Sequence, residues 1–236
     1  MNKNKIDLKK AFNAFVLFSL IATTIFLIYA IAVAPVDRNA IDSFERVKSD
    51  YILMFVQCLL GIFAMLLPGI IEKKIKIEIP STMLLLYTLF LYCAIYLGEV
   101  KNFYYTIPYW DTILHTCSGA MLGALGFSFV SLLNRQQQIP VQLTPVFVSL
   151  FAFCFAITLG VFWEIYEFTF DGILGLNMQK FALETGELLV GRSALLDTMK
   201  DLIVDSIGAF VMSVIGYISI KYKKGWIEEL LLTSKK

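Results

Sequence analysis

The sequence predicts an all-α fold: a membrane-embedded bundle of six transmembrane helices in one domain covering residues 1–236. Of these residues, 58% are hydrophobic and only 17% are charged, whereas soluble domains carry about 25% charged residues. The hydrophobic residues fall into six long runs, each about the length that crosses a hydrocarbon core of ~30 Å. Lysine and arginine also alternate between rich and poor connecting segments. These three observations exclude an ordinary soluble protein and predict a multi-pass membrane protein surrounded by lipid.

The predicted spans have short connections, except for one long loop at residues 169–196. They cover residues 11–34, 52–71, 82–99, 110–133, 145–168 and 198–220. Isolated strands cannot satisfy their backbone groups in lipid, so each span is predicted to be a helix. The first follows the charged segment MNKNKIDLKK, as in a signal peptide, but its apolar run exceeds the usual length of about 7 to 15 residues. We therefore expect this helix to stay uncleaved.

The distribution of basic residues predicts that both chain ends are cytoplasmic. Thirteen of the 20 lysines and arginines lie in the N-terminal tail, the connection EKKIKIEIPS, the connection at Arg135 and the C-terminal tail. Cytoplasmic segments of membrane proteins are enriched in lysine and arginine. The other connections, including the long loop, are acidic and are therefore predicted to lie outside.

With this orientation, acidic side chains from three spans meet in the outer half of the membrane. Residues three, four or seven positions apart share one face of a helix. The candidate residues are Asp111 and His115 in the fourth span, Glu164, Glu167 and Asp171 in the fifth, and Asp197, Asp201 and Asp205 in the sixth. Small residues on these faces are expected to let the helices approach closely; they are Gly119, Gly123, Gly160, Gly208 and Gly216.

The charges of the carboxylates that lie deeper in the membrane need to be compensated. An aspartate near the centre of a transmembrane helix costs about 2.5 to 3.5 kcal/mol on insertion scales, so Glu164, Asp201 and Asp205 together oppose insertion. Few cations are available nearby: Lys200, Arg192 and, when protonated, His115. The sequence therefore predicts either partly protonated acids or a bound metal ion. Acids buried inside membranes usually mark a functional site.

Some of the polar residues also have simpler structural interpretations. Asp111 and Asp197 stand at helix starts, where a carboxylate caps free N–H groups and suits the helix dipole. Asp171 is expected in a solvated loop, and Glu99 is expected as an interfacial acid at the outer end of the third span. A lone interior histidine such as His115 often serves as a structural hydrogen-bond partner. Each of these residues becomes a stronger candidate for a functional site only because the other acidic residues are expected to lie near it.

The other motifs indicate no chemistry. The four cysteines lie singly in four spans without CxxC spacing, so they imply neither a disulfide framework nor a zinc ribbon. There is no Walker loop, GxSxG or HExxH motif, and no basic aromatic stripe indicates nucleic-acid binding. A single histidine excludes a histidine-rich metal site. The loop segment NMQKFALETGELLVGRSA suits a short amphipathic or re-entrant element, and hence a lid over the acidic cluster.

The segments WDTILHTCSGAMLGAL, FWEIYEF and DTMKDLIVDSIGA resemble the YjdF-like family of bacterial inner-membrane proteins. In that family an aspartate and a histidine open one span, Trp-Glu-x-x-Glu lies on the next, and D-x-x-x-D-x-x-x-D precedes a small-residue helix. The resemblance covers about residues 50–220. It implies a protein of the bacterial cytoplasmic membrane and no particular substrate. The fourth span is also similar, more weakly, to VanZ-like membrane proteins, because Thr112 replaces a lysine of their pattern and Asp205 replaces an asparagine.

The first function class that fits these residues is a metal site. Its carboxylates would bind one or two divalent cations, Mg²⁺, Mn²⁺, Ca²⁺ or Zn²⁺, acting on a lipid-linked or cell-envelope substrate from the outer leaflet. His115 and Glu164 are the predicted catalytic residues, with His115 as a ligand or general base. The predicted metal ligands are Asp111, His115, Glu164, Glu167, Asp197, Asp201 and Asp205, which the family resemblance also treats as one constellation.

Two other classes remain open. In the second, the acids form a cation or proton relay in a small transporter or substrate-binding membrane subunit. A transporter of this size, without an internal repeat, would need to form a homo-oligomer or bind a partner. In the third, a structural or immunity-type membrane protein uses the acids only to hold its helices together. The sequence leaves open whether the protein is an enzyme.

Overall fold

The computed structural model describes residues 8–36, 46–135, 143–183 and 186–234, and these residues form an all-α fold with six helices long and apolar enough to cross a membrane. The spanning segments are α1 (Leu8–Val33), α2 (Lys48–Ile75), α3 with η1 (Ser81–Leu91 and Tyr92–Val100), α5 (Trp110–Arg135), α6 (Pro145–Leu174) and η2 with α7 (Gly191–Leu195 and Leu196–Lys221). The short elements are α4 (Phe103–Thr106), η3 (Glu228–Leu230) and two strands, β1 (Ile77–Glu78) and β2 (Thr233–Ser234). The predicted fold class is confirmed.

Several helices extend beyond their apolar runs, among them α2 and α6. α2 covers Lys48–Ile75 rather than 52–71, and α6 continues to Leu174, where Gly175 ends it in a left-handed conformation with φ 65°. Asp171 therefore lies within α6 and is buried, so the expectation that it belongs to a solvated loop is wrong. Its carboxylate can be buried because it accepts backbone hydrogen bonds from Met178 and Gln179 of the following loop.

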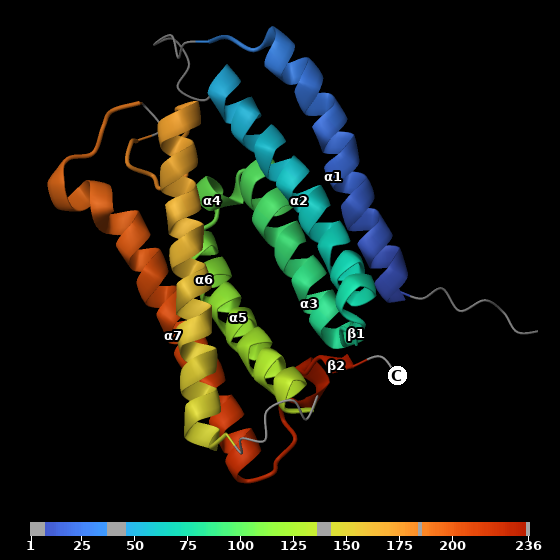
Figure 1. The fold of residues 1–236 in the computed structure, drawn as a ribbon. Helices are drawn as coiled ribbons and strands as arrows, with labels where there is room; N and C mark the ends of the chain where they lie inside the picture. Colours follow the sequence, from blue (N-terminus) through green and yellow to red (C-terminus); the bar gives the residue numbers. More distant parts are fainter. Residues whose placement is uncertain (1–7, 37–45, 136–142, 184–185, 235–236) are drawn as a thin grey trace, which may run out of the picture.

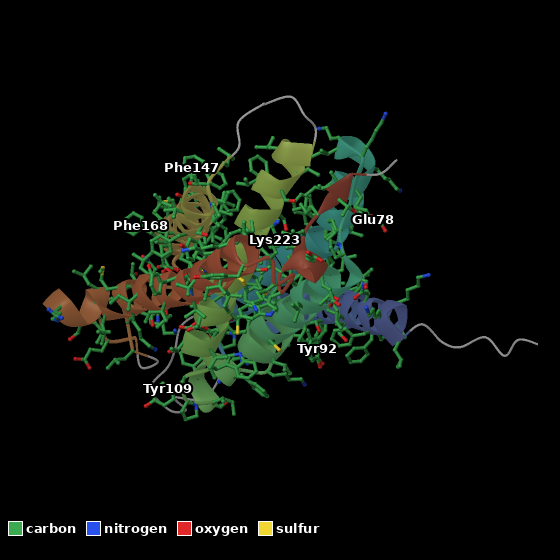
Figure 2. All side chains as sticks on the ribbon, turned by 90° about the horizontal axis from the view of Figure 1, so that it is seen from below. Glu78, Tyr92, Tyr109, Phe147, Phe168 and Lys223 are labelled. Atoms are coloured by element: carbon green, nitrogen blue, oxygen red, sulfur yellow. The ribbon has the colours of Figure 1, made fainter. Side chains whose placement is uncertain are left out.

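The helices pack as two groups of three that lie side by side (Figure 1). In the N-terminal group, α1, α2 and α3 with η1 surround a core that includes Leu20 and Cys58. In the C-terminal group, α5, α6 and α7 surround a core that includes Phe127. Large apolar side chains cover much of the exterior; Phe147 and Phe168, for example, project outward from α6 (Figure 2). An apolar exterior of this kind is expected for a protein surrounded by lipid.

Glycines allow α5, α6 and α7 to approach closely, as the small-residue pattern predicts. A Cβ at Gly119 would collide with the backbone carbonyl of Asp205, and a Cβ at Gly208 would collide with the carbonyl of Thr116. A Cβ at Gly160 would lie 3.0 Å from Asp205 Oδ2. The two α5–α7 contacts involve backbone on both sides and cannot relax by a rotamer change. These glycines therefore fix the helix positions around Asp205.

The ends of the described chain lie at the same end of the bundle. Lys9 Nζ of α1 donates to Ser81 Oγ of α3 at 2.7 Å. Residues 225–234, the C-terminal strap, cross from α7 to the N-terminal group, where β2 pairs antiparallel with β1 (Figure 1). Ser128 of α5 holds the strap by donating to the carbonyl of Leu230 at 2.7 Å. The side of the membrane on which this end lies stays a prediction.

Pro68 lies inside α2, and its effect on the helix is compensated by α3. Proline has no backbone N–H, so the carbonyl of Ala64, four residues earlier, loses its usual partner. The hydroxyl of Tyr87 donates to this carbonyl at 3.0 Å. The hydrogen bond therefore restores the missing backbone interaction and joins α2 to α3.

Candidate functional site

Acidic residues of α5, α6 and α7 converge at the end of the bundle opposite the C-terminal strap. α5 and α7 begin at this end and α6 ends there. The first two turns of α5 contribute Asp111 and His115, and the first three turns of α7 contribute Asp197, Asp201 and Asp205.

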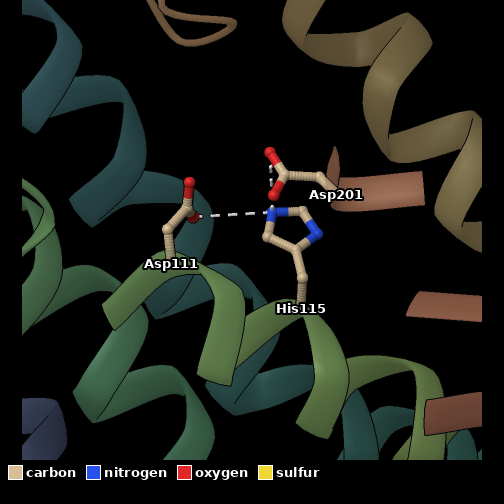
Figure 3. A group of neighbouring side chains, drawn as sticks. All are labelled: Asp111, His115 and Asp201. Atoms are coloured by element: carbon tan, nitrogen blue, oxygen red, sulfur yellow. Dashed lines mark ion pairs between the residues drawn. The ribbon is translucent and has the colours of Figure 1, made fainter. Parts of the chain in front are cut away.

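His115 lies between three aspartates, two of which appear in Figure 3. Its Nδ1 is 3.2 Å from Asp205 Oδ2, within hydrogen-bonding distance. Its Nε2 points toward Asp111 Oδ1 at 3.6 Å and Asp201 Oδ2 at 3.9 Å (Figure 3). One ligand-type atom from each of Asp111, His115 and Asp201 lies within 4.8 Å of the others. We call these three residues the triad.

Asp205 orients the histidine ring. Ser118 Oγ donates to Asp205 Oδ1 at 2.6 Å, which leaves Oδ2 for His115 Nδ1. An ionised carboxylate only accepts hydrogen bonds, so Nδ1 donates, and a neutral ring presents the Nε2 lone pair to Asp111 and Asp201. Asp201 is only 1% exposed, and its Oδ1 accepts no hydrogen bond from any described residue. The triad therefore contains a nitrogen and a buried oxygen suited to a further partner.

Lys180, absent from the predicted site, supplies a cation from the loop after α6. Its Nζ donates to Asp111 Oδ2 and, at 3.1 Å, to Asp197 Oδ1. Burial alone lowers the pKa of Lys180, but the charges of Asp111 and Asp197 outweigh this effect and raise that pKa above its ordinary value. The expected capping role of Asp197 is wrong, because α7 has no side-chain hydrogen bond at its N-terminus and Asp197 pairs with the lysine instead.

The loop that carries this lysine is held by side-chain hydrogen bonds. Asp171 accepts from the backbone N–H groups of Met178 and Gln179 at 2.8 and 3.0 Å. The Asn177 side chain bonds both backbone groups of Ala182, at 2.8 and 3.0 Å. The role of Asp171 is therefore to fix the loop above the cluster.

Glu164 lies beside the triad rather than within it. The residue is 5% exposed, and the side-chain amide of Gln179 lies close enough to interact with its carboxylate. It lies within electrostatic reach of His115, Asp197 and Asp205. The structure therefore brings this predicted catalytic residue to the cluster but does not group it with the atoms that surround Nε2.

Glu167 and Tyr104 complete the surroundings. Glu167 is buried and accepts a hydrogen bond from Trp163 Nε1 at 2.9 Å. Tyr104 of α4 lies within electrostatic reach of both Asp111 and Glu167. Burial raises the pKa of Tyr104 well above its ordinary value, and the neighbouring carboxylates add to this effect. The phenol therefore stays neutral and adds no negative charge to the cluster.

The cluster carries more carboxylates than cations. Seven carboxylates lie in this region: Asp111, Glu164, Glu167, Asp171, Asp197, Asp201 and Asp205. Among the described residues, the cationic partners hydrogen-bonded to these acids are Lys180 and, when protonated, His115. Unpaired charge buried away from water is unfavourable, so protons or a bound cation must offset the remainder.

A multi-span helix bundle with a histidine–carboxylate cluster at one end defines the class of this membrane protein. Residues 14–222 match a family described as predicted membrane proteins (DUF2238), and the chain belongs to this family. An uncharacterised protein of Thermotoga maritima is 32% identical over 151 residues, which cover 64% of this chain and 69% of that protein. No solved structure matches the chain. The resemblance to YjdF-like proteins agrees with this family, whereas no match supports the VanZ-like similarity.

Ser118 and Lys180 are the cluster residues that were not predicted from sequence. Ser118 lies three positions after His115, on the same side of α5, and this spacing was the available signal. Lys180 is a basic residue in a loop predicted to be external and otherwise mainly acidic. A lysine that departs from the charge pattern of its segment is a candidate partner for nearby buried acids.

Proposed function

We propose that this membrane protein binds one divalent cation at the triad and uses it in an enzymatic reaction on a lipid-linked or cell-envelope substrate. The observation that carries the proposal is the position of His115 Nε2, which points between Asp111 Oδ1 and Asp201 Oδ2 at 3.6 and 3.9 Å. These distances are long for hydrogen bonds. Ligand atoms that each lie about 2.1 Å from a shared ion are about 3 to 3.5 Å apart, which is close to the observed spacing.

The surroundings of the triad support the same proposal. The hydrogen bond from His115 Nδ1 to Asp205 is the arrangement that orients metal-binding histidines in proteins. Asp201 adds a buried oxygen that accepts no hydrogen bond from any described residue. Two carboxylates and one imidazole suit Mn²⁺, Zn²⁺ or Mg²⁺ and leave coordination positions for water or substrate. A bound ion would supply Lewis-acid activation of an ester or phosphoryl oxygen.

Glu164, which has no hydrogen-bonded cation among the described residues, favours a second candidate function. A buried carboxyl group without a hydrogen-bonded cation, within reach of His115 and Asp205, is suited to carrying a proton. In this alternative, the acids form a proton or cation relay in a small transporter. The two candidates differ in whether the purified protein retains stoichiometric metal.

Elemental mass spectrometry on detergent-purified protein tests the proposed function. We expect about one equivalent of a divalent metal in the wild type and its loss in the variants His115→Ala and Asp201→Asn, because each removes a ligand. Glu187→Gln, which changes an exposed carboxylate of the outer loop, should retain the metal. Absence of metal from the wild type, even after incubation with Mg²⁺, Mn²⁺, Ca²⁺ and Zn²⁺, would exclude the metal site and favour the relay.

A further inference from the structure

We propose that Asp111 and Asp197 form a second cation subsite, which the chain fills with the ammonium group of its own Lys180. The inference deepens the proposed function and rests on it in one respect, namely that the two subsites share Asp111. The second subsite lies on the loop side of the triad and uses a different set of oxygen atoms.

The hydrogen bonds of Asp111 define the two positions. Its Oδ2 accepts from Lys180 Nζ, whereas its Oδ1 faces His115 Nε2 at 3.6 Å. The same ammonium group donates to Asp197 Oδ1 at 3.1 Å. Carboxylates from two helices, α5 and α7, therefore hold one positive charge between them. This position is one that a metal ion with oxygen ligands could occupy.

Asp201 is a third carboxylate within electrostatic reach of this position. It lies one helical turn from Asp197 on α7, is 1% exposed, and interacts electrostatically with Asp111, Asp197 and Lys180. Its Oδ2 faces His115, while its Oδ1 accepts no hydrogen bond from a described residue. A buried oxygen without a hydrogen-bond partner is uncommon in proteins and is often explained by a bound water or ion. Removal of the lysine would therefore leave up to three carboxylates to bind a cation.

The loop is built to deliver the ammonium group. Lys180 has φ 47°, a left-handed backbone conformation that side-chain-bearing residues rarely adopt. Neighbouring interactions hold this conformation: Gln179 Nε2 donates to Thr198 Oγ1 of α7 at 2.9 Å, and Asp171 binds the loop backbone. Lys180 Nζ also lies 5.9 Å from the ring centre of Tyr104. Backbone strain at a residue that contacts two partly buried acids is typical of a functional position.

The occupied subsite has a consequence for stoichiometry. The wild-type cluster should bind one divalent ion, because the ammonium group already holds the second position. Loss of the lysine charge should open that position, and the freed carboxylates should bind an additional ion. If Lys180 only ties the loop to the helices, its replacement should not increase the number of metal ions bound.

The test is equilibrium binding of Mn²⁺ to the full-length purified protein, followed by elemental analysis. The variants Lys180→Met and Lys180→Gln should each bind one more equivalent than the wild type. Lys180→Arg keeps the positive charge and should bind the wild-type number. Lys200→Met is the matched control, because Lys200 lies within electrostatic reach of Asp197 but, among the described hydrogen bonds and ion pairs, those of Asp111 and Asp197 with a lysine are formed by Lys180; this variant should also leave the number unchanged.

The outcomes separate this inference from the proposed function. One equivalent in the wild type and two in Lys180→Met support both proposals, whereas equal numbers in the two proteins overturn the second subsite. No metal in the wild type and one equivalent in Lys180→Met would refute the proposed triad site while supporting the subsite. If Lys180→Met and Lys180→Gln fold poorly, adding Mn²⁺ or Ca²⁺ at about 1 mM during purification should restore monodisperse protein. Failure of this rescue overturns the inference.

Discussion

At the residue scale, Tyr87 illustrates how one hydroxyl compensates for a proline. Its hydrogen bond to the Ala64 carbonyl replaces the backbone bond that Pro68 removes from α2. We expect Tyr87→Phe to lower the free energy of unfolding by about 1 kcal/mol, measured by denaturation in mixed micelles. In a Pro68→Ala background the backbone N–H returns, and the same change should have a smaller effect.

The exposed Tyr29 provides the control for this double-mutant cycle, because Tyr29→Phe removes a hydroxyl from the outer surface of α1. Its effect on unfolding should be close to zero in both backgrounds. An equal loss of stability for Tyr87→Phe with and without Pro68 would contradict the compensation.

Lys180 gives a pH dependence whose direction follows from its raised pKa. A group with a raised pKa in the folded protein contributes its full stability below the ordinary lysine value of about 10.4. That contribution is lost as the pH rises through the higher value of the folded state. We expect Lys180→Met to lower stability by roughly 1 to 3 kcal/mol, between the ranges for surface and buried ion pairs.

Melting temperatures of the wild type and Lys180→Met check this expectation. Their difference should stay constant between about pH 7 and pH 9 and narrow only above about pH 10.4. A difference that disappears below pH 9 would show that the ammonium charge does not provide the stability.

At the scale of elements, the contact between α5 and α7 depends on two glycines that face backbone atoms. Gly119→Ala or Gly208→Ala would force the helices apart, because the new Cβ meets a carbonyl that cannot rotate away. We expect a loss of roughly 3 kcal/mol or more in unfolding free energy, or failure to fold. Proteolysis of membrane-inserted protein and mixed-micelle unfolding would measure the effect.

Gly172→Ala is the control for this pair, since no atom lies within 4 Å of the Cβ position at this exposed glycine of α6. Alanine favours helix more than glycine by about 1 kcal/mol, so this variant should be at least as stable as the wild type. If the glycine variants of α5 and α7 behave like Gly172→Ala, the close approach is not required.

The helices could be predicted from sequence to different degrees. Hydropathy located all six spans because length and apolarity are local properties of the chain. It did not predict the end of α6, because the last turn carries the acidic Asp171, whose burial depends on hydrogen bonds to a loop seven and eight residues away. Helical spacing placed the acids of α5, α6 and α7 on converging faces without knowledge of the packing.

At the scale of the whole molecule, the orientation of the bundle is a separate prediction. The chain ends described here lie at one end of the bundle and the acidic cluster at the other. The distribution of basic residues predicts that the cluster lies on the outer side of the membrane. In a cysteine-free background, a membrane-impermeant maleimide should label Glu187→Cys in intact cells and Glu229→Cys only after lysis. The reverse pattern would invert the predicted topology.

The strand pair provides a second prediction at this scale. Glu78 lies opposite Thr233 in the antiparallel pair, so cysteines at these two positions should form a disulfide under mild oxidation. Lys74→Cys with Thr233→Cys is the control and should cross-link less, because Lys74 lies in α2 outside the pair. Equal cross-linking of both pairs would indicate that the strap is not fixed in this register.

The contacts in the site between residues far apart in the chain could not be predicted from sequence. Lys180 and Asp111 are 69 positions apart, and their contact depends on how the loop after α6 folds over two other helices. The Asp111–His115 relation, in contrast, needed only the repeat of one helix. Local spacing therefore predicted the residues on each helix, whereas the cation that pairs with them required the tertiary structure.

The C-terminal strap also constrains the order in which the protein can be assembled. β1 is synthesised before α3, α5, α6 and α7, yet its strand partner β2 follows all of them. During synthesis, β1 must therefore remain without that partner while four more spans are inserted into the membrane. The helix groups also touch directly, for example where Trp110 Nε1 of α5 donates to the carbonyl of Cys93 in η1 at 3.3 Å, but the link through the strap forms only when it docks, so this docking is a late step in biogenesis.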